Sequence, residues 1–420
     1  MLDRLETNPP PAPVARSRRA PRLLGRALGA ASWAAFALLL AWNGWCLWAD
    51  WSPPDPAAID ARIARGQHAE AEPELRRLLR SSPEDGEARM KLARLLAIRG
   101  DRPACGRELH QVPAWSPRKA EALFLEGQVY KQLDRARDAE PAWKALLADD
   151  PLHPVPKRYS HGAARDLIGL YVVERRLPEI REVILRVYDT ADTSERPGVL
   201  LQRIRAELEL VAHPEAAAKL RQYVAADPDD WEARRALGFE EHALGDEAAA
   251  DRDLQACLEA RPADVAAWRD WLKILAERGD TAAIKAAVER LPAEADGDAH
   301  LWLARGNVRQ LDGDLAGAAE AFRQAVKLDP YLPEAHYKLG QAEQVLGDAD
   351  AARLHRDRSR QLYRVLTDLR PAYEGVLDAS QKATPDRPAY EAAVRRLSDV
   401  CRDLGWAKES AAWLRVLAGG

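Results

Sequence analysis

Residues 300–330 of this 420-residue chain read HLWLARGNVRQLDGDLAGAAEAFRQAVKLDP. Apolar and small residues recur through the stretch at helical spacing, which predicts two amphipathic helices. Gly313 and Asp314 interrupt the pattern at the point where a left-handed residue would end the first helix and an N-cap residue would begin the second. Pro330 then stops the second helix. The stretch therefore predicts two helices joined by a tight turn.

The same pattern recurs along most of the chain. Gly245, Gly279, Gly313 and Gly347 stand 34 residues apart, and five residues after most turn marks stands a small residue, such as Ala250, Ala318 and Ala352. The turn column as a whole holds Gly66, Gly100, Asp134, Leu177, Val211, Gly245, Gly279, Gly313 and Gly347. Nine units share this pattern, and a single unit leaves an apolar face exposed. Stacking the units would bury that face as a continuous core.

The unit at residues 300–330 resembles the tetratricopeptide repeat. The resemblance rests on Trp302, Gly306, Gly313, Ala318, Phe322, Ala325 and Pro330, and it extends over roughly residues 56–352. It implies an all-α fold, a right-handed α-solenoid of helix pairs, with repeats 1–3 in residues 50–150 and repeats 4–9 in residues 164–352. The unit at Leu177 departs from the pattern, since it follows 43 residues after the previous mark. The excess falls in a Pro-rich insertion loop, residues 151–163.

The period lapses after Ala352. Apolar residues predict one long helix that ends near Pro371, followed by a last helix pair hinged at Gly405. Terminal units of a solenoid must cover its core against water. We therefore expect residues 353–420 to form C-terminal capping helices with a degenerate repeat. No stretch shows the two-residue alternation of β-strands.

The amino-terminal region predicts a tail followed by a membrane anchor. Residues 1–26 are rich in Pro and Arg and predict a disordered basic tail. Residues 27–49 are uncharged and, as a helix of about 34 Å, would cross a hydrocarbon core of roughly 30 Å. This length argues against a cleaved signal peptide or a buried core helix, and Trp45 before Cys46 argues against a lipoprotein signal.

The flanks of this predicted transmembrane helix set its orientation. Arginines precede the segment, and Asp50, Asp55 and Asp60 follow it. Positive residues remain on the cytoplasmic side, so we expect a single-pass protein of the inner membrane with a cytoplasmic N-terminus. The repeat domain would then be periplasmic.

Motifs for catalysis, cofactors and metals are missing from the sequence. It contains no glycine-rich phosphate loop, no HExxH, no closely spaced cysteine pair and no Gly-x-Ser-x-Gly turn. We expect Cys105, Cys257 and Cys401 to be buried packing residues, and we expect no metal at His153 and His161. Residues 50–420 carry a net charge of -8, which argues against nucleic-acid binding.

The resemblance also implies a partner-binding surface, because tetratricopeptide repeats bind extended peptides or partner helices on the concave face lined by the first helix of each pair. Such a groove would suit an acidic or carboxylate-ended segment, since it gathers Arg, Asn, Gln and Tyr side chains. The alternative is a concave wall that is merely solvated. The implied groove residues are Arg235, Phe239, His242, Arg269, Lys273, Leu303, Asn307, Gln310, Tyr337, Lys338, Gln341 and Gln344.

Two other side-chain stripes have simpler interpretations. Trp268, Trp271 and Trp302 fall on the helix-packing positions of the repeat, so we expect them in the core. Basic residues at helical spacing, from Arg353 to Arg364, predict a solvated face, with anionic lipid or an acidic partner as the alternative. The stripe consists of Arg353, Arg356, Arg360 and Arg364. Arg356 takes the place of the usual aromatic residue, which predicts unusual packing of its helix.

These features predict a non-enzymatic, membrane-anchored scaffold of a bacterial-type envelope that binds one or more protein partners in its groove. The main alternative is a regulatory or substrate-presenting subunit of a separately encoded envelope enzyme or assembly machine. A catalytic activity within residues 353–420 is the least favoured interpretation, because about 68 residues of capping helix rarely form an enclosed pocket.

Overall fold

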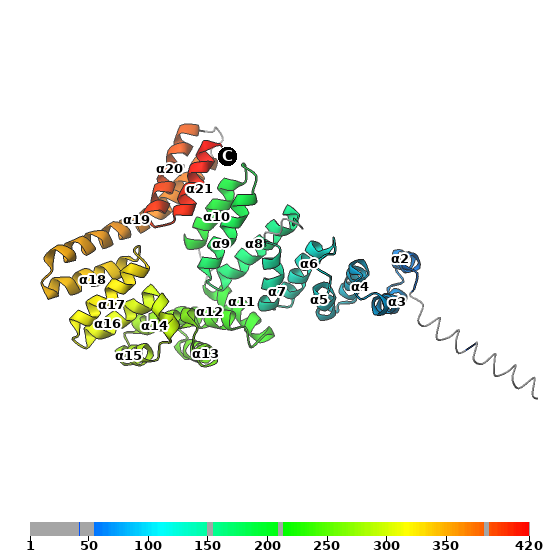
Figure 1. The fold of residues 1–420 in the computed structure, drawn as a ribbon, viewed down its shortest axis with the longest axis horizontal. Coiled ribbons are helices and arrows are strands. Elements are labelled where there is room, and N and C mark those ends of the chain that lie inside the picture. The colour runs from blue at the N-terminus through cyan, green and yellow to red at the C-terminus, as the bar shows by residue number, and fades with distance from the viewer. Residues whose placement is uncertain (1–41, 43–53, 149–153, 209–212, 382–385, 420) are drawn as a thin grey trace, which may run out of the picture. The chain divides into compact units, whose positions relative to one another are not determined.

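The computed structural model describes residue 42 and residues 54–148, 154–208, 213–381 and 386–419. Within these ranges all regular secondary structure is helical and there is no β-strand, as predicted (Figure 1). The predicted tail and nearly all of the predicted anchor, residues 27–49, lie outside the described residues. Of the helices described, none combines the length and the apolar character that crossing a membrane requires.

The chain divides into two units, residues 1–95 and 96–420. In the first unit, α2 (Pro56–Ala64) and α3 (His68–Ser81) are followed by α4 (Gly86–Arg99), which runs across the boundary. Gly66 joins α2 to α3 with a left-handed φ of 76°. Ile59, Ala71 and Leu75 are fully buried, so this pair packs as the period predicts.

The second unit begins beyond Leu95 and holds the remaining α-helices and a short 3-10 helix, η1 (Ala293–Gly297) (Figure 1). The α-helices are α5 (Arg102–His110), α6 (Lys119–Gln132), α7 (Ala136–Ala145), α8 (Lys157–Val173), α9 (Leu177–Thr190), α10 (Arg196–Leu208), α11 (His213–Ala226), α12 (Trp231–Ala243), α13 (Glu247–Ala260), α14 (Val265–Arg278), α15 (Thr281–Glu289), α16 (Ala299–Leu311), α17 (Leu315–Leu328), α18 (Pro333–Leu346), α19 (Ala349–Gln381), α20 (Arg387–Asp403) and α21 (Ala407–Ala418).

The predicted Gly-Asp turn is confirmed. Gly313 has a φ of 81°, and the Asp314 side chain accepts a hydrogen bond from the Gly317 N–H at 2.8 Å, which caps α17. Asp134 takes the same left-handed conformation without being glycine, at a φ of 57°. In the divergent unit the left-handed residue is Arg175, at 58°, and Leu177, which the sequence pattern assigns to the turn, already belongs to α9.

Close helix packing repeats at a second column of glycines. A Cβ built on Gly306 would collide with the ring of Phe322, and one on Gly238 would come within 2.8 Å of Leu254. A Cβ on Gly340 would lie 2.9 Å from Cγ of Arg356. The aliphatic part of Arg356 thus fills the aromatic position, so the prediction that this helix packs unusually is wrong. The Arg356 guanidinium reaches out to Gln344 at 2.8 Å.

Two predicted boundaries are wrong, both around prolines. The predicted insertion loop 151–163 ends early, because α8 begins at Lys157; Pro156 takes the cap position, where a missing N–H costs nothing. The helix predicted to end near Pro371 continues to Gln381. Pro371 is exposed, and buried Leu369, Ala372 and Tyr373 hold the helix on both sides of it, so packing outweighs one lost hydrogen bond.

The divergent region connects distant parts of the second unit. α10 packs on α9 and also on α19 and α21, whereas α11 packs on α12 and α8. One hydrophobic cluster joins Tyr188, Leu200 and Ile204 to residues of the C-terminal helices, including Trp413. Glu409 of α21 is fully buried and pairs with Arg181 of α9 at 2.7 Å. The C-terminal helices therefore cover the middle of the repeat region, beyond the terminal cap that the sequence predicts.

Candidate functional site

A groove of about 610 Å³ runs along the first helices of successive pairs in the second unit. α14 and α16 form most of its wall, α12 and the start of α18 contribute one residue each, and the turn between α8 and α9 closes one side. The lining residues are Arg175, Leu177, Phe239, Arg269, Asp270, Leu272, Lys273, Ala276, Glu277, His300, Leu301, Leu303, Ala304, Asn307 and Glu334. The groove lies on the helices that the resemblance implies.

The floor of the groove is apolar. Phe239, Leu272, Leu301 and Leu303 all line it, and each is at most 8% exposed because neighbouring helices pack beneath them. Ala304 also lines the groove, and its short side chain leaves room above the floor. An apolar floor between charged walls suits a side chain of a partner segment better than a small polar ligand.

Two cations flank the aromatic ring in this floor. The guanidinium carbon of Arg175 lies 4.0 Å from the ring centre of Phe239, and Nζ of Lys273 lies 4.9 Å from it. Arg175 also pairs with buried Glu240 at 3.1 Å. Both distances to the ring fall within the range of cation–π attraction. Arg175 therefore joins the turn between α8 and α9 to Phe239 of α12, and Lys273 reaches the same ring from α14.

Most charges along the rim are already paired. Arg269 contacts Asp298 at 2.5 Å, and Asp298 caps α16 through the Leu301 N–H. Lys273 is about half exposed, and among the described residues the carboxylate that pairs with it is Glu277, at the long distance of 3.9 Å. Lys273 is therefore the groove cation that is best placed to bind a new carboxylate.

The structure brings together part of the predicted set. Phe239, Arg269, Lys273, Leu303 and Asn307 line the groove. His242 is not part of the lining but bonds to Glu277, which is, at 3.0 Å, and to Glu247 at 2.9 Å. The groove lining also does not include Arg235, Gln310, Tyr337, Lys338, Gln341 or Gln344.

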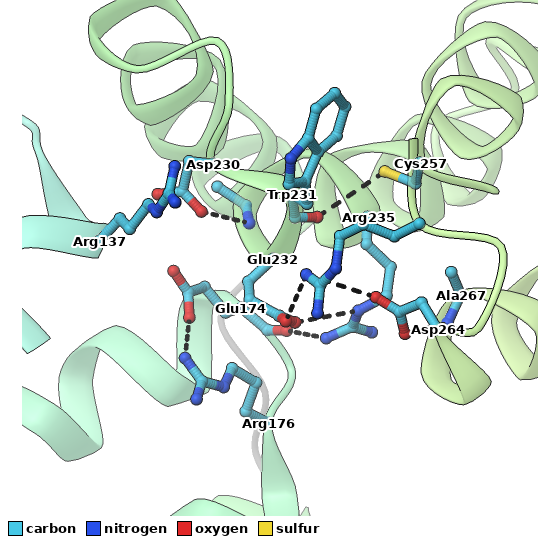
Figure 2. Close-up of polar contacts among 12 residues, drawn as sticks. Arg137, Glu174, Arg176, Asp230, Trp231, Glu232, Arg235, Cys257, Asp264 and Ala267 are labelled. Carbon is cyan, nitrogen blue, oxygen red and sulfur yellow. Dashed lines mark hydrogen bonds and ion pairs between the residues drawn. The ribbon is translucent and has the colours of Figure 1, made fainter. Parts of the chain in front are cut away.

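The predicted exposure of Arg235 is wrong. The resemblance implies an exposed side chain, but only 5% of Arg235 is exposed. Its guanidinium contacts Asp270 at 2.5 Å and donates to the Glu174 carbonyl at 3.2 Å (Figure 2 shows it with Glu174 and Glu232). Because these partners come from the next helix pair and from the α8–α9 turn, Arg235 joins three elements beneath the groove. The same expectation of exposure is wrong for Phe239 and Leu303, which line the groove but are mostly covered.

Sequence reasoning missed one wall of the groove. Arg175 and Leu177 come from a unit that departs from the period, so no column places them there. One signal was available: in the divergent unit an arginine stands where most turns have glycine, and a left-handed residue with a long side chain implies a use for that side chain.

The other predicted side chains have clear positions. Cys105, Cys257 and Cys401 are at most 3% exposed, as predicted, and burial raises the pKa of Cys105 to about 11 and of the other two to about 12. Trp268 and Trp271 are buried as predicted, whereas Trp302 is only partly buried. Arg353, Arg360 and Arg364 are exposed, as a solvated face predicts. No trio of His, Cys, Asp or Glu among the described residues is arranged to hold a metal ion.

Comparison with known proteins identifies the repeat. A tetratricopeptide-repeat model matches residues 62–123, and a TPR-repeat model matches residues 306–347. No curated protein matches the chain.

Three solved structures illustrate the similarity. A crystal structure of MamA is 18% identical with a TM-score of 0.32, and the match covers 37% of this chain and 91% of MamA. TTC0263, a thermophilic TPR protein of Thermus thermophilus, is 21% identical with a TM-score of 0.31, covering 42% and 92%. The APC/C hetero-tetramer Cut9–Hcn1 is 15% identical with a TM-score of 0.33, covering 85% and 78%. The two family matches identify tetratricopeptide repeats in residues 62–123 and 306–347.

Proposed function

We propose that this protein is a non-enzymatic scaffold that holds a segment of a partner protein in the groove of α12, α14 and α16. Tetratricopeptide repeats are consistent with a protein–protein interaction scaffold. The observation that carries the proposal is the apolar floor of Phe239, Leu272 and Leu303 beside the half-exposed Lys273. A partner segment would place an apolar side chain on the floor and a carboxylate against Lys273.

The proposal includes a membrane anchor at residues 27–49, with the repeats on the periplasmic side of the inner membrane. Its support is the sequence: an uncharged stretch of spanning length, preceded by arginines and followed by aspartates. If a reporter enzyme that works only outside the cytoplasm is fused to the C-terminus, we expect the fusion to be active. A reporter that works only in the cytoplasm would overturn the orientation, and mature protein that begins near Asp50 would overturn the anchor.

A charge reversal tests the groove. Lys273→Glu replaces attraction of a partner carboxylate by repulsion. The substitution also removes the ion pair between Lys273 and Glu277, but both side chains are about half exposed, so losing this pair should not unfold the protein. Lys327→Glu is the matched control, because Lys327 is exposed on α17, a second helix outside the groove lining. Arg269 is less suitable, since its reversal would set a carboxylate beside Asp298 and disturb the cap of α16.

The measurement is quantitative recovery of crosslinked partners from the native membrane. Loss of a stoichiometric partner with Lys273→Glu, but not with Lys327→Glu, is the expected result. If that partner is one enzyme, the protein is a regulatory or substrate-presenting subunit; if it is an assembly, the protein is a scaffold. Equal recovery with both variants would exclude this groove as the binding surface.

A further inference from the structure

A second pocket, of about 450 Å³, lies on the other side of the turn between α8 and α9. Arg137 and Glu140 of α7 form one wall, Glu174 of the turn forms another, and the start of α12 closes it with Asp229, Asp230, Trp231 and Glu232. Arg261 completes the lining. In Figure 2 the carboxylates of Glu174 and Asp230 and the side chain of Arg137 are drawn close together.

The pocket holds more negative than positive charge. Arg176 alone serves three carboxylates: Glu140 at 2.8 Å, and Glu174 and Glu179 at 3.0 Å each. Arg261 forms an ion pair with Glu232 at 3.1 Å. Arg137 donates to the Asp229 carbonyl at 3.2 Å, and its nearest paired carboxylate is Asp227 at 3.9 Å. The two cations of the lining, Arg137 and Arg261, are thus directed to acids other than Asp230 and Glu174.

Asp230 is the unsatisfied member. It is only 3% exposed, and Oδ1 accepts the Ala233 N–H at 3.1 Å as the cap of α12. Oδ2 is buried and makes no hydrogen bond of normal geometry. The backbone N–H of Arg137 still acts on this carboxylate and opposes the rise in its pKa. A buried carboxylate oxygen that the chain satisfies this poorly points to a further donor from outside the chain.

The titration of the two acids agrees with a missing positive charge. Burial raises the pKa of Glu174 to about 8; Arg176 opposes this shift and the Asp230 carboxylate adds to it. Burial also raises the pKa of Asp230. A cation between the two carboxylates would remove their mutual repulsion and favour both charged forms.

A guanidinium fits this site better than a metal ion. Among the described residues no group of three or more ligating side chains could hold a metal. A guanidinium presents five N–H donors in one plane, enough for Asp230 Oδ2 and Glu174 together. We propose that the pocket binds the side chain of an arginine from a partner protein. This site is separate from the groove and stands without it.

Small arginine compounds test the site on the full-length protein. At pH 8.5, above the pKa of about 8 of Glu174, N-acetyl-arginine amide should bind saturably in calorimetry, and the neutral isostere N-acetyl-citrulline amide should not. Glu174→Gln should weaken binding about tenfold, because one charge-assisted hydrogen bond is lost. Glu320→Gln, an exposed acid of α17 outside the pocket, is the control and should change nothing.

A second variant covers the case in which Glu174→Gln does not fold. Arg137 has an exposed side chain, and with the described residues it makes one long ion pair and one hydrogen bond to a carbonyl, so Arg137→Gln should fold. It should tighten binding of the arginine compound by making the pocket more negative. Equal responses to the arginine and citrulline compounds would overturn the proposal, and so would binding that neither Glu174→Gln nor Arg137→Gln changes. Equal binding of N-acetyl-lysine amide would mean that charge, rather than the guanidinium shape, is recognised, and the proposal of arginine would then be wrong.

Discussion

The guanidinium carbon of Arg175 lies 4.0 Å from the ring centre of Phe239, although 64 residues separate them in the sequence. Arg175 is the left-handed residue of the turn between α8 and α9, with a φ of 58°. Most other turns of the repeat place glycine there, which adopts this conformation without strain. Arg175 therefore holds a strained backbone conformation, and its side chain closes one wall of the groove.

Two substitutions of Arg175 separate these effects. Both Arg175→Ala and Arg175→Gly remove the contacts with Phe239 and Glu240, but only glycine relieves the left-handed backbone. We expect the glycine variant to be more stable than the alanine variant by about 1 kcal/mol in urea unfolding. Equal free energies of unfolding for the two variants would contradict a strained turn.

Glu174 makes the stability of the fold depend on pH. Burial raises its pKa from 4.5 to about 8, so the folded state holds a proton that the unfolded state has released throughout that window. The contribution of Glu174 to stability is therefore present below about pH 4.5 and is lost as the pH rises towards 8. Glu174→Gln should flatten this part of the curve of unfolding free energy against pH. An unchanged slope would show that Glu174 is not the titrating group.

The packing register predicts opposite outcomes at two positions. Ala318 is fully buried where α16 and α17 meet, so Ala318→Trp should destabilise the protein by about 1–3 kcal/mol or more. Gln341 is partly exposed on α18, and Gln341→Ala should change stability by less than about 0.5 kcal/mol. Thermal unfolding of both variants checks the register; similar shifts in Tm would mean that it is wrong.

The contact of α21 with α9 and α10 should behave as one cooperative unit. Glu409→Ala leaves Arg203, which is 2% exposed, without one of the two carboxylates that pair with it among the described residues, and removes the Glu409 partner of Arg181. We expect a loss of about 3 kcal/mol and faster hydrogen exchange in α10 as well as in α21. Glu182→Ala, which removes only an exposed pair with Arg186, is the control. Faster exchange confined to α21 would show that the two segments open independently.

The sequence predicts the repeat well because local packing enforces it. The glycine of the turn, the small residue at Ala318 and the close approach at Gly306 each have a steric cause within one helix pair, so their spacing carries the register. The same local logic places Phe239, Lys273 and Asn307 on the groove side.

The failures come from contacts that no local period encodes. Arg235 is buried because Asp270, 35 residues later, pairs with it. The contact of Tyr188 with the Ala412 carbonyl, at 3.0 Å, spans 224 residues, and nothing in either segment predicts the other. Arg175 escapes prediction for the same reason, since its partners lie two helix pairs further along.

Photo-crosslinking in the native membrane tests the binding groove most directly. Benzoylphenylalanine at Ala304, in the groove wall, should crosslink a partner protein in a stoichiometric, saturable manner. The same group at Ala286, exposed on α15 outside the groove lining, should give no such product. The account predicts a product at Ala304 that Lys273→Glu abolishes. A product at Ala286 alone, or one at Ala304 that persists with Lys273→Glu, would contradict it.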